Sequence, residues 1–401
     1  METVGQREGV RARGVGPLLA STAISVTGDG AFIAAAPLLA ASLTRNPVAV
    51  STVTAAFYLP WLLTGLLAGA LVDRWPRRPV LVAADLVRAV ILTMLAALVF
   101  VRAVNVLFLV TVVLLVGIAQ CFFDSAAQAT IPAVVGRDKE ALTHTNGRFW
   151  ALDTVGRSLI GPPLGSTTFA LNKTLPFLGD ALSFLASAVL VSRLPRVPAS
   201  DGPREGLLTA VREGLQHLIH TRDLRALAFS MGAYNFGYNL AIATFVLYAK
   251  DVLRVADAGY GVLLAAMAVG GVIAGWRAAS LTRRLSYRQV QAAALLVQGL
   301  AWAGVALAPN AVVVGLLFTF LGAGSSLASV AVGSARQALT PDKLLGRVVS
   351  AFRLFGLGAA GLGALAGGFV ADWQGLRAPL LVAAALLILA VVPTWSRESA
   401  T

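Results

Sequence analysis

The chain has 401 residues, of which 57% are hydrophobic and 13% are charged, and its formal net charge is +13. A soluble protein carries about 25% charged residues, so this composition excludes a set of soluble domains and indicates a membrane protein. The one cysteine, Cys121, lies inside an apolar run, which excludes a disulfide framework and disfavours a metal cluster.

Twelve apolar runs follow one another along the chain, and each is long enough to cross a bilayer, which takes about 20 residues. The first six cover 17–43, 48–72, 79–101, 104–127, 141–170 and 174–192, and the second six cover 224–249, 258–281, 289–308, 311–334, 346–370 and 376–395. The first run is too long for a signal-peptide core, so we interpret it as a retained membrane helix. The runs predict an all-α membrane protein with twelve transmembrane helices.

Lysine and arginine are distributed unequally between the loops. If the runs cross the membrane alternately, 24 of the 32 basic residues fall on the side of the N-terminus and six on the other side, while Arg88 and Arg157 lie within runs. Basic loops face the cytoplasm, so both termini are predicted to be cytoplasmic and the protein to be a multi-pass protein of the inner (plasma) membrane. The basic charge therefore needs no nucleic acid to explain it.

The longest break between runs, 193–223, lies at the middle of the chain. It begins with prolines and continues with apolar residues at helical spacing from Leu207 to Ile219, which predicts an amphipathic helix on the cytoplasmic membrane face. We expect an N-terminal six-helix bundle (1–192), a cytoplasmic linker (193–223) and a C-terminal six-helix bundle (224–401).

The two halves resemble each other. Gln-Ala-Thr-Ile-Pro at 128–132 recurs 209 positions later as Gln-Ala-Leu-Thr-Pro at 337–341, and Arg74 maps at the same offset onto Arg283. Two six-helix pseudo-repeats are an architecture of secondary transporters, which bind substrate between the halves.

The strongest motif follows the second run. It reads Gly69-Ala-Leu-Val-Asp73-Arg74-Trp-Pro-Arg77-Arg78. Gly69 would allow close helix approach, Asp73 would meet a helix N-terminus, and the arginines would pair with a carboxylate such as Asp124 in one conformation only. The motif resembles the loop signature of the major facilitator superfamily, where it latches the outward-facing state, although Pro76 replaces the usual glycine. An ordinary basic inner loop is the alternative interpretation.

A second motif lies in the fifth run and includes Gly161, Pro162 and Gly165. The glycines form a smooth face and the prolines predict a kink. The motif partly resembles the export motif of the antiporter branch of the same superfamily, although Arg157 and Ser166 stand where that motif has glycines. A role in helix packing alone is the alternative.

Several charged residues are predicted to lie inside the membrane. Asp29 is about 18 Å into the first helix and no basic residue lies within a turn of it, so we expect it to bind a proton reversibly and to couple transport. Two alternatives to this role are that Asp29 caps a break in the helix at Gly28 and Gly30, or that it pairs with an arginine from another helix. The spacing predicts structural pairs of Asp85 with Arg88 and of Asp153 with Arg157, and Asp153 is the second coupling candidate. Asp180, near the start of the sixth run, is expected to be shallow.

Polar and aromatic side chains gather on the seventh run. Tyr234, Asn235, Tyr238 and Asn239 lie within six residues and are predicted to form part of a substrate cavity wall. The alternative is that they pack against neighbouring helices or anchor the helix at the membrane interface.

The resemblance to the major facilitator superfamily extends over the whole chain. Gly28-Asp29-Gly30 in the first run, Pro60 and the Asp73 loop are most similar to the drug/proton antiporter branch of macrolide and siderophore exporters. The resemblance implies a major facilitator fold and export of a small, partly apolar molecule (drug, antibiotic or siderophore type). It also implies that the proton gradient is the energy source, that no cofactor is needed, and that membrane lipid surrounds the protein. We expect the protein to function as a monomer.

Two other functions remain as alternatives. One is a proton-coupled uptake permease of the same fold, which the partial export motif disfavours. The other is an intramembrane enzyme, which is disfavoured because all three histidines lie in predicted cytoplasmic loops and no metal-binding spacing occurs, so we predict no catalytic residues. A phosphate-binding loop for an ATP-driven pump is absent from the sequence.

Overall fold

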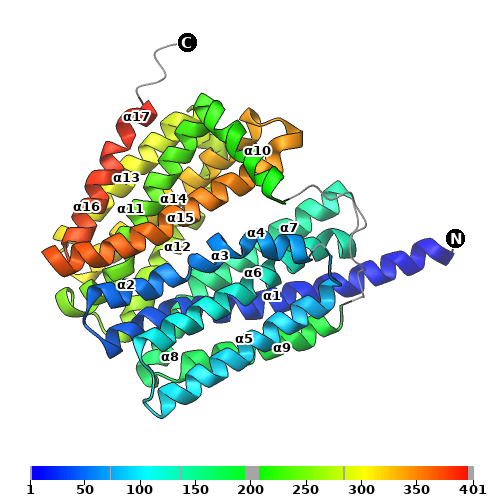
Figure 1. Cartoon of the computed structure of the whole chain (residues 1–401), viewed down its shortest axis with the longest axis horizontal. Coiled ribbons are helices and arrows are strands. Elements are labelled where there is room, and N and C mark those ends of the chain that lie inside the picture. The colour runs from blue at the N-terminus through cyan, green and yellow to red at the C-terminus, as the bar shows by residue number, and fades with distance from the viewer. Residues whose placement is uncertain (1, 73, 136–137, 195–206, 283–284, 396–401) are drawn as a thin grey trace. The chain divides into compact units, whose positions relative to one another are not determined.

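The computed structural model describes residues 2–72, 74–135, 138–194, 207–282 and 285–395. These residues form helices, with no strand among them (Figure 1). Each of the twelve predicted apolar runs contains helix in the structure, which confirms the all-α architecture. Eight of the described helices are, each on its own, long and apolar enough to cross a membrane.

One compact unit, unit 1, comprises residues 1–39 and 63–203. Its elements are most of α1 (Glu2–Leu43), α4 (Gly65–Val72), α5 (Arg77–Phe100), α6 (Val106–Val135), α7 (Lys139–Thr154), the π-helical turn η1 (Val155–Ile160), α8 (Gly161–Leu171) and α9 (Leu175–Ser192). Helix α5 packs along both α6 and α9. An apolar core that includes Leu81, Phe123 and Val191 joins these three helices.

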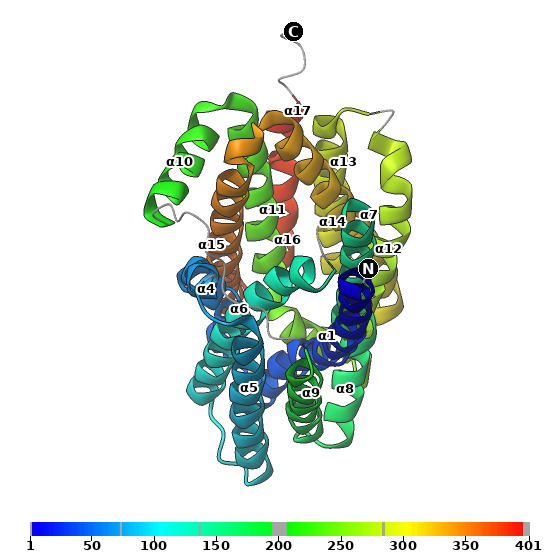
Figure 2. The same cartoon turned by 90° about the vertical axis from the view of Figure 1, so that its right-hand side faces the viewer.

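The other compact unit, unit 2, comprises residues 40–62 and 204–401. Its elements are α2 (Pro47–Ala56), most of α3 (Leu59–Leu63), α10 (Leu207–His220), α11 (Arg222–Leu247), the π-helical turn η2 (Tyr248–Val252), α12 (Asp257–Thr282), α13 (Tyr287–Leu307), α14 (Ala311–Leu339), α15 (Asp342–Gln374), α16 (Ala378–Leu389) and α17 (Val391–Trp395). Helix α11 packs on α15 and α16, and α12 packs on α14 (Figure 2).

Local sequence signals account for several helix ends. Ser286 and Gln289 form a capping box at the start of α13, and the Asn310 side chain accepts hydrogen bonds from two backbone N–H groups of α14. Gly375, with φ +86°, ends α15. The second run is broken at residues 57–58 because the ring of Pro60 clashes with the carbonyl four positions earlier.

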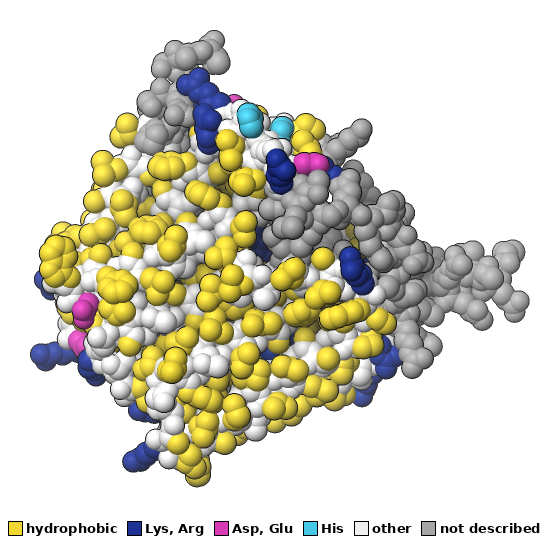
Figure 3. Space-filling view, in the orientation of Figure 1, with side chains coloured by type: hydrophobic (Ala, Val, Ile, Leu, Met, Phe, Trp, Pro, Cys, Tyr) yellow, Lys and Arg dark blue, Asp and Glu magenta, His cyan; other side chains and the backbone are white. Residues whose placement is uncertain are grey.

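The outer surface is largely apolar. Figure 3 shows hydrophobic side chains over most of the visible face. Large side chains such as Leu362, Phe369 and Trp373 are more than half exposed. Such a surface suits a lipid environment, where helices satisfy their own backbone hydrogen bonds.

Candidate functional site

Seven charged side chains gather inside unit 1, where charged groups are rare unless they are paired. They are Asp29 of α1, Asp85 and Arg88 of α5, Asp124 of α6, Asp153 of α7, Arg157 of η1 and Asp180 of α9. Five carboxylates thus share two arginines, and full ionisation would leave an excess of three negative charges.

Arg157 holds the centre of this cluster. Its Nη2 atom lies 3.0 Å from Oδ2 of Asp29, and its Nε atom donates a hydrogen bond of 3.1 Å to Oδ1 of Asp153. Asp124 also interacts electrostatically with this guanidinium. One arginine therefore stabilises carboxylates from three helices, so the charge state of each affects the others.

These contacts settle two of the sequence predictions about charge pairing. The predicted pair of Asp153 with Arg157 is confirmed. Asp29 has no basic residue within a turn on its own helix, but it pairs with an arginine from another helix, as one of the alternatives predicted. The sequence on either side of Asp29 contains no hint of this partner, because the pair depends on how closely η1 approaches α1.

Backbone contact between α1 and the η1–α8 segment brings Arg157 to Asp29. A Cβ atom at Gly30 would lie 2.5 Å from the Arg157 carbonyl oxygen, one at Gly161 would lie 2.5 Å from the Gly30 Cα, and one at Gly165 would lie 2.5 Å from the Ala31 Cα. Only glycine fits at these crossings. The glycines of the predicted export motif thus position the ion pair.

The π-helical turn has a local cause. Pro162 follows at the start of α8, directly after Gly161, whose N–H bonds to the Gly156 carbonyl five residues earlier. Proline supplies no N–H to continue an α-helical ladder, so the turn widens before it. Arg157 lies within this widened turn, and such π-turns are frequent at functional sites.

A second arginine, Arg88, is fully buried on α5. It donates hydrogen bonds to Asp85 and to the side-chain oxygen of Gln120, and its guanidinium lies between the rings of Phe123 and Phe184 at 4.5 and 4.0 Å. The predicted pair of Asp85 with Arg88 is therefore confirmed.

Gln120 links Arg88 to the groups around Arg157, and none of the sequence patterns predicted this link. Its amide nitrogen donates a hydrogen bond of 2.9 Å to Asp124, which in turn interacts with Arg157. The connected groups run from Asp85 through Arg88, Gln120 and Asp124 to Arg157. A glutamine within an apolar run was the only sequence signal for this link.

Asp180 completes the cluster from α9. Only 1% of it is exposed. Its Oδ1 atom accepts a hydrogen bond of 3.0 Å from Ser183, while Oδ2 has no hydrogen-bond partner in the part of the chain that the structure describes. Its charge interacts with that of Asp29.

The residues of the predicted latch lie around the α4–α5 connection. Asp73 falls outside the described residues, Arg74 is exposed, and Arg77 and Arg78 begin α5. No described contact joins these arginines to Asp124, which instead accepts a hydrogen bond from Gln120. No described atom lies within 4 Å of a Cβ built at Gly69, so the close approach expected there is not found among the described residues.

The predicted cavity wall on α11 is hydrogen-bonded within unit 2. Tyr234 donates a hydrogen bond of 2.8 Å to Ser325 of α14, and its ring lies 5.9 Å from that of Tyr238. Asn235 and Asn239 each donate to a backbone oxygen one turn earlier on the same helix. The Asn239 side chain is buried and also hydrogen-bonds with Tyr58, which lies in the same unit.

A cavity of about 690 Å³ lies beside these residues but does not include them. It is lined by other α11 side chains, among them Phe229 and Phe236, together with residues of α10, α15 and α16. The predicted wall residues and this cavity are therefore separate features of unit 2.

Comparisons with known proteins agree on one family. A family described as transmembrane secretion effectors matches residues 16–397. The multidrug efflux pump Tap of Mycolicibacterium fortuitum is 28% identical over 391 residues, covering 94% of this chain and 95% of that protein. An uncharacterised MFS-type transporter of Bacillus subtilis (strain 168) is 28% identical over 399 residues, covering 94% and 91%.

Two solved structures share the fold. A mutant of the nucleoside transporter NupG has a TM-score of 0.77 at 12% identity, covering 96% of this chain and 99% of that one. A bacterial homologue of the iron transporter ferroportin has a TM-score of 0.74 at 21% identity, covering 95% and 98%. At these identities the likeness concerns the fold alone.

Proposed function

The chain belongs to the transmembrane secretion effector family of the major facilitator superfamily, and from that premise we propose that it exports a small, partly apolar molecule in exchange for protons. It is a multi-pass transporter of the plasma membrane and not an enzyme. Relatives named as multidrug efflux pumps support the direction of transport and the broad substrate class. Alternating access by a monomer, with the proton gradient as the energy source, is part of the proposal.

The main support for proton coupling is that unit 1 contains more buried carboxylates than arginines to pair with them. Five buried or half-buried carboxylates share Arg88 and Arg157. An ionised carboxylate at the bilayer centre costs about 2.5–3.5 kcal/mol on insertion scales, so three uncompensated charges are strongly disfavoured. Bound protons, or a cationic substrate, would remove the excess.

Arg157 could link proton binding to a conformational change, because it contacts two of the carboxylates. When Asp29 and Asp153 are both ionised, they share the same guanidinium through different nitrogen atoms. A proton on Asp29 weakens its pair and leaves the arginine to Asp153, and loss of that proton restores the shared arrangement. The two protonation states thus differ in the attraction between α1 and η1, which is the differential interaction that a conformational change requires.

Transport in inverted membrane vesicles tests the proposal with ethidium as the probe. Export corresponds to uptake by these vesicles, and we expect accumulation when the lumen is acidic and little when the pH gradient is collapsed. An uptake permease would accumulate the dye only in right-side-out vesicles. No dye movement in either orientation with this or other apolar cations would refute the drug-exporter assignment.

Asp29→Asn tests the coupling residue. The variant keeps the shape and polarity of the side chain but cannot ionise, so it should lose accumulation driven by the pH gradient and retain exchange of dye across the membrane. Lys173→Gln, a change in an exposed loop residue, serves as the control. If Asp29→Asn still concentrates ethidium, Asp29 is not the coupling group and Asp153 is tested next.

A further inference from the structure

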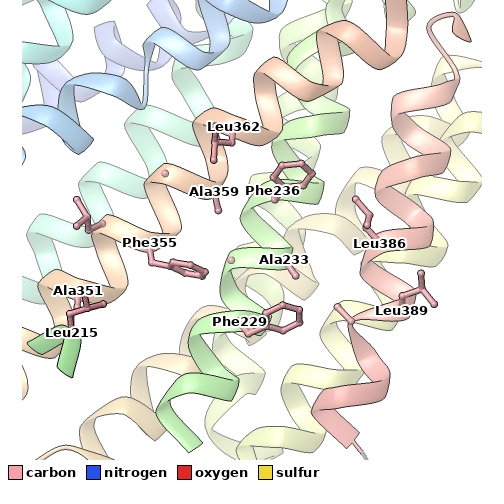
Figure 4. Close-up of a pocket in the computed structure, with 14 residues that line it drawn as sticks. Leu215, Phe229, Ala233, Phe236, Ala351, Phe355, Ala359, Leu362, Leu386 and Leu389 are labelled. Atoms are coloured by element: carbon pink, nitrogen blue, oxygen red, sulfur yellow. The ribbon is translucent and has the colours of Figure 1, made fainter. Parts of the chain in front are cut away.

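The cavity of unit 2 is an apolar groove on the outer surface between α10, α11, α15 and α16 (Figure 4). All fourteen side chains that line it are apolar or glycine, and several of them are well exposed, including Phe229 at 56%, Leu362 at 64% and Leu389 at 66%. For a chain in the plasma membrane, this groove is open to lipid.

Small residues form the floor of the groove and large ones its walls. Gly232 and Ala233 of α11 and Gly358 and Ala359 of α15 line it together with bulky phenylalanines and leucines. A Cβ at Gly232 would lie 3.0 Å from Cζ of Phe355, so the glycine allows this ring to lie against α11. The apolar lining extends along α15 from Ala351 to Leu362, which suits a hydrocarbon chain.

Basic side chains lie at the α10 end of the groove. Arg225 precedes Phe229 by one turn of α11, so it continues the stripe formed by Phe229, Gly232 and Phe236. Its Nη1 atom donates a hydrogen bond of 3.0 Å to the carbonyl oxygen of Ile219, which places the guanidinium at the α10–α11 junction.

Arg212 of α10 also lies next to a residue that lines the groove. It is exposed and precedes the lining residue Leu215 by three positions. Two nearby acids are already engaged, because Glu213 pairs with Arg347 and Asp223 pairs with Arg288. The space-filling view shows basic and histidine side chains at the edge of the molecule where α10 lies (Figure 3). This end of the groove is therefore positively charged.

We propose that the groove binds one anionic phospholipid of the bilayer. Its phosphate contacts Arg225 and Arg212, and an acyl chain lies along the floor between α11 and α15. The apolar groove favours a hydrocarbon chain, and its basic end favours an anion. A phospholipid supplies both, because its own structure fixes the distance between the phosphate and the acyl chain. Clusters of basic residues beside membrane helices recognise anionic lipid in this way.

Native mass spectrometry of the full-length protein, released from nanodiscs that contain equal amounts of phosphatidylglycerol and phosphatidylcholine, tests the proposal. We expect one retained phosphatidylglycerol per chain. Arg225→Gln and Arg212→Gln should each lower the ratio of retained phosphatidylglycerol to phosphatidylcholine about fivefold, the usual contribution of one basic residue near an anionic surface. Lys173→Gln, which is exposed in unit 1, should leave the ratio unchanged.

A second set of variants tests the groove itself. Ala359→Trp fills the floor and should abolish retention of both lipids, whereas Ala293→Trp, on an exposed position of α13, should not. Ala233→Leu is a smaller obstruction in case the tryptophan prevents folding, and thermal melting verifies each variant. Equal retention of the two lipids by the wild type, or unchanged retention in the filled variants, would overturn the proposal. A dimer that disappears with Ala359→Trp would overturn it too, because a second copy would then cover the groove.

Discussion

Replacing Arg157 by glutamine should destabilise the protein in a manner that depends on pH. The change removes two ion pairs, at 3.0 Å to Asp29 and 3.1 Å to Asp153, and leaves Arg88 as the one arginine of the seven-residue cluster. Loss of one partner from a buried pair costs about 3–5 kcal/mol. The Arg157 side chain is 26% exposed, so we place the loss near the lower limit, about 3 kcal/mol at neutral pH.

The sign of the pH dependence follows from the charges. The variant is weakest where the carboxylates that lost their cation are ionised, because they then repel one another. As the pH falls they take up protons, the repulsion disappears, and the difference from the wild type shrinks. Thermal unfolding in nanodiscs at pH 8 and pH 5.5 measures both values, and Arg148→Gln, an exposed change on α7, is the control.

A double variant separates charge from packing. Arg157→Gln combined with Asp29→Asn removes both members of one pair, so it should be more stable at pH 8 than Arg157→Gln alone. An equal loss of stability at both pH values, or a double variant whose loss is the sum of the two single losses, would show that the cluster does not act through its charges.

Three further predictions concern packing, the latch and topology. Gly161→Ala should lower the free energy of unfolding by about 1–3 kcal/mol, because its Cβ would meet the Gly30 backbone, while Gly179→Ala, where nothing lies within 4 Å, should have little effect in the same melting assay. Asp73→Asn should leave membrane insertion intact and reduce ethidium transport; wild-type rates would reduce that loop to a topology signal. A reporter that is active only outside the membrane should stay silent when fused after Thr401, and activity there would contradict the predicted orientation.

The fold was predictable from the sequence because its causes are local. Twelve apolar runs and the alternation of basic loops reflect the length and polarity that a bilayer demands of each helix. The pair of Asp153 with Arg157 was predictable for the same reason, since both residues lie one turn apart on one helix.

The charge cluster depends on contacts that no local pattern contains. Asp29 meets Arg157 only because Gly30, Gly161 and Gly165 let two backbones touch, and the sequence shows the glycines without showing which helix they face. Gln120 was missed because a single amide in an apolar run has no partner in its own vicinity. The burial of Asp180 is likewise set by α1, where Gly28 leaves room for its carboxylate.

The position of Arg157 in a π-helical turn matters for any mechanism in which protons change the shape of unit 1. Helices α1 and α8 touch through their backbones, so neither can shift alone without loss of that contact. Between α7 and α8 the α-helical hydrogen-bond ladder is interrupted at η1, and this is where the cation lies. If a proton moves from one carboxylate to another, the force on Arg157 changes. That force acts on η1, where the α-helical hydrogen bonds between α7 and α8 are interrupted. On the proposed proton coupling, the charge cluster and the turn would switch between two arrangements, and the protons bound by the carboxylates would select between them.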